Sequence, residues 1–110
     1  MLYTGSNIKK KIKIQDFINI IKRYNKNKIE CTPHTIFRLS QKQREIFTCE
    51  ELTEILLKNV PFLVGIQENK NYAAFYQHKN KNLKMIIGIE PQKVKIVTFY
   101  YILEWQIPKI

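Results

Sequence analysis

The fold class follows from residues 83–100, which read LKMIIGIEPQKVKIVTFY. Apolar side chains occupy alternate positions on both sides of Glu90-Pro91, a pattern typical of two β-strands joined by a short turn. Strands with so short a connection pair antiparallel, because parallel neighbours need a long crossover. The stretch therefore predicts a hairpin of strands at residues 83–89 and 94–100, with Ile87 and Ile96 in the interior.

Two more strands are expected just before this hairpin. Residues 62–66 alternate up to a polar turn at 68–71, and a second alternating run covers residues 72–76. The second half of the chain therefore predicts a four-stranded antiparallel meander. In its last strand, alternation is expected to place one set of residues on a common face, namely Val94, Ile96, Thr98 and Tyr100.

The first half of the chain has a helical period instead. Apolar residues within 14–24 recur every three or four positions, which describes one face of a helix, and the residues before them leave room for a short strand. A second helix is expected over residues 33–43, because Thr32 before Pro33 is a typical helix start. A third begins at a capping box at residues 48–51. We therefore expect an α+β fold, with N-terminal helices packed on one face of a four-stranded antiparallel meander sheet.

The composition is that of one globular domain. The chain has 110 residues, of which 45% are hydrophobic and 25% charged, and we expect a single domain over residues 1–110. Its apolar stretches are far shorter than the about 20 residues that a membrane-spanning helix needs. The N-terminus lacks the apolar run and cleavage site of a secretory signal. A soluble, cytoplasmic protein with no membrane partner is expected.

The two cysteines indicate neither a metal site nor a redox pair. Cys31 and Cys49 form no CxxC motif and have no histidine-rich segment beside them. We expect two partly buried, reduced thiols. The chain has a single aspartate, Asp16, and no glycine-rich phosphate loop, so neither a metal nor a cofactor is expected.

Positive charge is concentrated in the first half of the chain. The formal net charge is +10, and residues 1–48 hold eleven Lys and Arg against three acidic residues. Such a field attracts polyanions, with nucleic acid ahead of an anionic membrane and an acidic protein. We expect phosphate contacts from the N-terminal lysines, which are Lys9, Lys10, Lys11 and Lys13.

One face of the predicted sheet is expected to be open to solvent or a ligand. Rings and ammonium groups on such a face suit the stacked bases and phosphates of a single strand. The residues expected there are Tyr72, Tyr76, Lys84, Lys95 and Tyr101.

The second predicted helix carries a polar stripe. His34, Arg38 and Lys42 recur every four residues, so they share one side of the helix, while Ile36 and Leu39 turn inward. The stripe suits contact with phosphate groups. It also fits the ordinary solvated side of an amphipathic helix.

Three features follow one another along the chain. They are a basic helical half, this polar stripe, and a last strand that reads Val-Lys-Ile-Val-Thr-Phe-Tyr. The order resembles the small toxins of the RelE/ParE-like superfamily, most closely the BrnT-type branch and related uncharacterised domains. The family motif combines a helical histidine, an arginine one turn later, a further basic residue before the next helix, and a final Thr-x-Tyr-like segment. The matching residues are His34, Arg38, Lys42 or Arg44, and residues 98–100.

The resemblance covers about residues 30–101 and implies subdivisions of the single domain. It makes residues 1–29 an N-terminal basic segment and helix, residues 30–101 a toxin-like core, and residues 102–110 a C-terminal tail. It also implies a strand before the histidine-bearing helix, no longer than residues 28–31.

The resemblance further implies a metal-independent endoribonuclease or a ribosome-directed mRNA interferase. His34 would transfer a proton, since histidine suits proton transfer near neutral pH. Arg38 and Arg44 would stabilise the phosphate through paired N–H donors. Tyr76 or Tyr100 would stack on the nucleotide at the cleavage point. An acidic antitoxin protein is the expected partner, besides RNA.

Two other classes of function remain open. A nucleic-acid-binding module without catalysis is favoured by the absence of arginine from residues 62–76, where the ribonuclease members have strand arginines. A protein-interaction domain whose basic surface docks an acidic partner is the third possibility.

Overall fold

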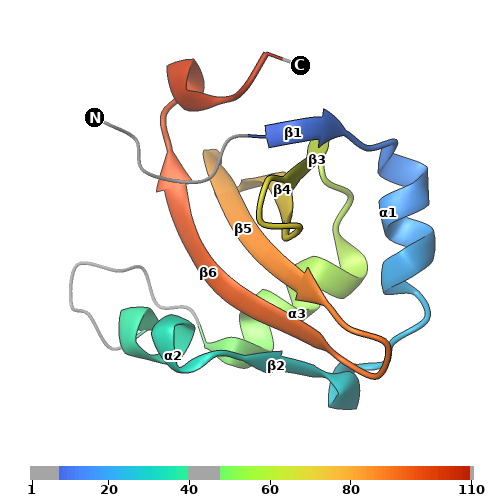
Figure 1. Cartoon of the computed structure of the whole chain (residues 1–110). Coiled ribbons are helices and arrows are strands. Elements are labelled where there is room, and N and C mark those ends of the chain that lie inside the picture. The colour runs from blue at the N-terminus through green and yellow to red at the C-terminus, as the bar shows by residue number, and fades with distance from the viewer. Residues whose placement is uncertain (1–7, 40–47, 110) are drawn as a thin grey trace.

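The computed structural model describes residues 8–39 and 48–109, and Figure 1 shows how their helices and strands are arranged. Lys42 and Arg44 lie outside the described residues, as does the predicted end of the second helix. The elements, with η marking a 3₁₀ turn, are β1 (Ile8–Lys11), α1 (Ile14–Ile21), η1 (Lys26–Lys28), β2 (Ile29–Cys31), α2 (Pro33–Leu39), α3 (Cys49–Lys58), β3 (Leu63–Gln67), β4 (Tyr72–His78), β5 (Lys81–Ile89), β6 (Val94–Ile102) and η2 (Glu104–Gln106).

The strands form one six-stranded sheet, in the order β1-β3-β4-β5-β6-β2. β3 to β6 pair antiparallel with their neighbours in the chain. β1 adds an antiparallel edge beside β3, and β2 adds a parallel edge beside β6. The prediction of a four-stranded antiparallel meander carrying N-terminal helices is therefore wrong. β1 and β2 have only four and three residues, too few for alternation to reveal which strand each one joins.

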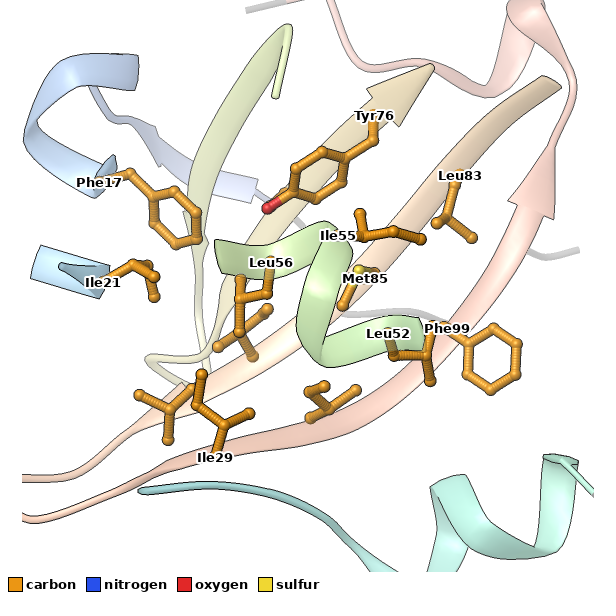
Figure 2. Close-up of a cluster of buried hydrophobic side chains, with 14 of the residues drawn as sticks. Phe17, Ile21, Ile29, Leu52, Ile55, Leu56, Tyr76, Leu83, Met85 and Phe99 are labelled. Atoms are coloured by element: carbon orange, nitrogen blue, oxygen red, sulfur yellow. The ribbon is translucent and has the colours of Figure 1, made fainter. Parts of the chain in front are cut away.

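The main core lies between the helices α1 and α3 and one face of the sheet (Figure 2). Phe17 and Ile21, one helical turn apart, are the buried side of α1. α3 begins at the predicted capping box, which is confirmed: the Thr48 hydroxyl accepts from the Glu51 amide at 3.0 Å, and the Glu51 carboxylate accepts from the Thr48 amide at 3.1 Å. The helix contributes its own buried set, namely Leu52, Ile55 and Leu56.

A β-bulge changes the faces of the last strand. Ile87 pairs with Ile96, but Ile86 pairs with Thr98, so β6 has one extra residue at Val97. Both Ile87 and Ile96 are fully buried, as predicted. Beyond the bulge, however, Phe99 joins Ile96 in the main core. The predicted alternation from residue 94 to 100 is therefore wrong after residue 96, because the extra residue reverses every later side chain.

The opposite face of the sheet is covered, not open. A second cluster of buried hydrophobic side chains lies on this face. Ile8 of β1 and Ile107 after η2, which come from the two ends of the described chain, pack against this second cluster. The expected open platform is therefore wrong, because Tyr72, Tyr76 and Tyr101 belong to the main core. The buried members of this second cluster are Leu63, Ala73, Phe75, Ile86 and Ile102.

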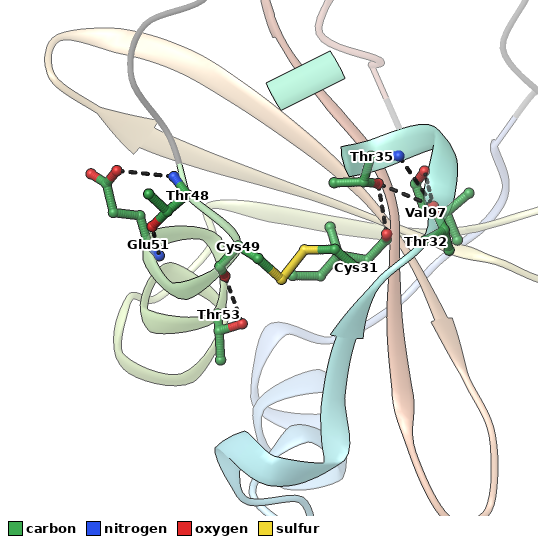
Figure 3. Close-up of a disulfide and its surroundings, with 9 residues drawn as sticks. Cys31, Thr32, Thr35, Thr48, Cys49, Glu51, Thr53 and Val97 are labelled. Carbon is green, nitrogen blue, oxygen red and sulfur yellow. Dashed lines mark hydrogen bonds between the residues drawn. A yellow bond between two sulfur atoms is a disulfide. The ribbon is translucent and has the colours of Figure 1, made fainter. Parts of the chain in front are cut away.

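The two cysteines form a disulfide (Figure 3). Cys31 ends β2 and Cys49 begins α3, and their Cα atoms are 6.1 Å apart, within the usual range for a disulfide. The expectation of two reduced thiols is therefore wrong. The partners are 18 residues apart and form no local motif, so only the packing of α3 beside β2 brings them together.

Across residues 8–39 and 48–109, no helix has the length and apolar character needed to cross a membrane.

Candidate nucleic-acid interface

Hydrogen bonds join the start of α2 to β6, directly after the end of β2 (Figure 3). The Thr32 amide donates to the Ile96 carbonyl at 3.1 Å, and the Thr32 hydroxyl donates to the Val97 carbonyl at 3.0 Å. The Thr35 hydroxyl donates to the Ile96 carbonyl at 2.7 Å. Ile96 is the register partner of Cys31, the last residue of β2, so these bonds extend the contact with β6 beyond the end of β2. The first turn of α2 is therefore held at the bulge of β6.

His34 lies on this fastened turn and is exposed to solvent, whereas Thr35 beside it is fully buried. Arg38 follows His34 by four residues in α2, but its side chain lies outside the described part. Of the three predicted catalytic residues, the structure therefore describes the side chain of His34 alone. The bonds of its neighbours Thr32 and Thr35 hold the turn at Ile96 and Val97 of β6.

Lys84 lies in the middle of the opposite face of the sheet. Its side chain is 1% exposed, and its ammonium nitrogen is 5.6 Å from the ring centroids of both Phe75 and Tyr100. Phe75 and Tyr100 are also its register partners on β4 and β6. Burial lowers the pKa of Lys84 to about 8. The two ring faces offset part of the cost of burying the ammonium group.

Tyr76 and Tyr100 lie on opposite faces of the sheet. Tyr76 is 1% exposed in the main core, where no nucleotide reaches its ring, and burial raises the pKa of its hydroxyl well above the usual range. Its hydroxyl is buried and has no hydrogen-bond partner among the described residues. Tyr100 is half-buried beside Lys84 and Ile102, at the rim of the second cluster.

The predicted phosphate-binding lysines lie near two different edges of the sheet. Lys9, Lys10 and Lys11 are exposed on β1, the edge strand at one end of the sheet order, and Lys13 is exposed directly after it. Lys95 lies on β6 near the other edge, where its ammonium group is 3.1 Å from the Glu90 carboxylate. The sheet therefore separates the basic edge β1 from α2 and its histidine.

Within the described ranges, no group of three or more His, Cys, Asp and Glu side chains is arranged to hold a metal ion. At the start of α2, His34 contributes an exposed imidazole, whereas the hydroxyls of Thr32 and Thr35 are bonded to β6 carbonyls.

Sequence reasoning missed two features of this surface. The sequence predicts a helix start at Thr32 but assigns no role to Thr35, although two hydroxyls flank Pro33 and His34. Trp105, the single tryptophan of the chain, was assigned no role, yet its side chain is 77% exposed.

No protein-family model matches the chain, and no curated protein or solved structure shows significant similarity to it.

Proposed function

We propose that this protein binds RNA and cleaves it without a metal ion, in the manner of the RelE/ParE-like toxins that its sequence resembles. The observation that carries the proposal is the position of His34, an exposed imidazole on a turn that two threonine hydroxyls hold against β6. An exposed histidine on such a turn, in a chain of net charge +10, is suited to proton transfer at an RNA phosphodiester.

The proposed reaction uses the ribose 2′-hydroxyl of RNA as the nucleophile. His34 accepts the 2′-hydroxyl proton as the 2′-oxygen bonds to phosphorus. The bond from phosphorus to the 5′-oxygen breaks, that oxygen takes a proton from water, and the hydroxide left behind removes the proton from His34. The products are a 2′,3′-cyclic phosphate and a free 5′-hydroxyl. Arg38 and Arg44 stabilise the crowded phosphate, because guanidinium groups donate paired hydrogen bonds to phosphate oxygens.

Cleavage of a labelled RNA in the presence of EDTA tests this proposal. Activity should persist in EDTA and disappear when a deoxyribose replaces the ribose at the cleaved position. His34→Ala should reduce the rate by about 10²–10⁴. His78→Ala is the matched control, because His78 is the other histidine of the chain and ends β4, away from α2. Arg38→Ala should cost about 10²–10³ in rate.

A second candidate is an RNA-binding module without catalysis. It is favoured by the burial of Tyr76, which removes one of the two rings expected to orient a nucleotide. RNA that binds the protein and stays intact for hours, with and without ribosomes, would support this candidate and reject cleavage.

An acidic antitoxin protein remains part of the proposal, supported by the net charge of +10. A pull-down that uses this protein as bait, at low and at high salt, tests for the acidic partner. Its binding should weaken as the salt concentration rises.

A cytoplasmic location also remains a proposal, and the disulfide argues against it. Disulfides persist mainly in oxidising compartments and are rare in the cytosol of most cells. Trapping the thiols of Cys31 and Cys49 with an alkylating reagent at the moment of cell lysis distinguishes the two settings. Fully alkylated cysteines would indicate a reducing compartment.

A further inference from the structure

In the C-terminal segment after β6, the side chain of Trp105 lies outside the core. η2 is closed by three hydrogen bonds: the Gln106 amide to the Leu103 carbonyl at 2.9 Å, the Ile107 amide to the Glu104 carbonyl at 3.1 Å, and the Leu103 amide to the Gln106 side-chain oxygen at 2.7 Å. Ile107 then packs against the second cluster. Trp105 remains 77% exposed on this ordered turn. The ring is therefore presented to solvent by a defined segment of the fold.

This tryptophan lies at the same end of the molecule as the basic edge strand. Ile107, two residues after Trp105, and Ile8 of β1 pack against the same cluster of buried side chains. Figure 1 shows η2 and β1 together at the end opposite η1. The exposed residues Lys9 to Lys11 follow Ile8 directly.

The charge along β1 is positive, and one carboxylate lies near its start, since the exposed Glu68 follows Gln67, the register partner of Ile8. No acidic residue occurs from Ile8 to Gln15, and Lys109 adds an exposed ammonium group to the tail. Glu104, beside Trp105, is the acidic residue of the tail. An exposed indole and a row of ammonium groups at the same end of the molecule match the two chemical parts of a single strand, flat bases and phosphates.

We propose that Trp105 and the β1 lysines Lys9, Lys10 and Lys11 form a binding site for single-stranded nucleic acid. One base stacks on the indole, and the neighbouring phosphates contact the ammonium groups. The site rests on the proposed binding of RNA and adds a base-stacking contact that is separate from His34. Stacking tolerates any base, so the site has little sequence preference.

The fluorescence of the single tryptophan reports directly on this site. Titration with short oligo(rU) should quench Trp105, and added salt should weaken binding steeply. Trp105→Ala should weaken binding about tenfold without changing the salt dependence, with binding followed by a label on the oligonucleotide. Trp105→Phe should restore part of the affinity. A triple change of Lys9, Lys10 and Lys11 to Gln should flatten the salt dependence.

The matched control changes Lys22, Lys26 and Lys28 to Gln. These are exposed lysines at the end of α1 and in η1, and η1 lies at the opposite end of the molecule from β1 (Figure 1). This variant should keep Trp105 quenching and lose less affinity than the β1 triple variant. Equal losses in the two triple variants, or unchanged affinity in Trp105→Ala, would overturn the site.

Vesicles of equal parts phosphatidylserine and phosphatidylcholine test the competing occupant. A blue shift of Trp105 on these vesicles, with no quenching by oligo(rU), would overturn the nucleic-acid site in favour of a membrane surface. The cleavage assay separates this site from the proposed function. Cleavage that depends on His34 but not on Trp105 would reject the site alone. Binding of the labelled oligonucleotide that weakens in Trp105→Ala, without any cleavage by the wild-type chain, would reject catalysis alone.

Discussion

The hydroxyl of Thr35 donates a hydrogen bond to the carbonyl oxygen of Ile96 at 2.7 Å, and both side chains are fully buried. This bond joins α2 to β6 across 61 residues of sequence. It fixes the turn that presents His34, so the position of the proposed base depends on a neighbouring threonine.

Thr35→Val should lower the free energy of unfolding by about 1–3 kcal/mol, because valine keeps the shape but leaves the Ile96 carbonyl without its hydroxyl partner. Urea unfolding measures the loss. Thr35→Ser is the control, since serine keeps the hydroxyl and lacks only the methyl group. An equal loss in both variants would show that packing of the methyl group, not the hydrogen bond, stabilises this contact.

Removing the disulfide should destabilise the fold. Replacing Cys31 and Cys49 with serine should cost about 3 kcal/mol, because the bond closes a loop of 18 residues and restricts the unfolded chain. Denaturant unfolding with and without a reductant measures the effect. The wild-type chain should lose stability on reduction, whereas the double variant should not respond. A wild-type chain that is equally stable in both conditions would contradict a stabilising disulfide.

Lys84 should make stability depend on pH in the alkaline range. Its pKa falls from about 10.5 to about 8 on folding, so between these values the unfolded chain binds the extra proton. Stability should therefore rise as pH increases from about 8 towards 10, by at most about 3 kcal/mol. Below pH 8 both states carry the charge, and the contribution stays constant. Lys84→Met should abolish the rise, as measured by urea unfolding across this range.

Tyr76 should make the stability of the fold decrease with pH, at pH values above those at which Lys84 acts. Burial raises the pKa of its hydroxyl, so above about pH 10 the folded chain retains a proton that the unfolded chain has lost. Stability should then fall with pH, and Tyr76→Phe should reduce that fall. A steeper fall in this variant than in the wild-type chain would contradict the burial of the hydroxyl.

The turn between β4 and β5 offers a stabilising change. Lys79 and Asn80 have φ angles of 53° and 64°, and the flanking residues His78 and Lys81 are paired. Two central residues with positive φ define a type I′ hairpin turn, for which Asn-Gly is the preferred sequence. Changing Lys79 to Asn and Asn80 to Gly should raise the unfolding free energy by about 0.5–1 kcal/mol. The same pair placed at Gln92 and Lys93, whose φ angles are not positive, should give no gain.

The helical and extended segments could be predicted because they depend on near neighbours. The strands between residues 62 and 96 show alternation, and they pair in chain order because the connections are short. The capping box uses two side chains three residues apart, so Thr48 and Glu51 were sufficient to place the start of α3. The exposure of His34 agrees with its predicted polar stripe, but Ile36, which was expected to turn inward, is 56% exposed, so that part of the prediction is wrong.

Only the tertiary structure decided the sheet edges, the faces of β6 and the covered second face. The strands β1 and β2 are too short to carry a periodic signal, and the partner of each is distant in the chain. The bulge at Val97 reverses the side chains that follow it, which alternation alone cannot reveal. The Cys31–Cys49 bond and the hydrogen bond from Thr35 to Ile96 likewise join segments that meet only after the sheet has formed. Sequence spacing describes neighbours along the chain, whereas these contacts depend on how separate segments pack against one another.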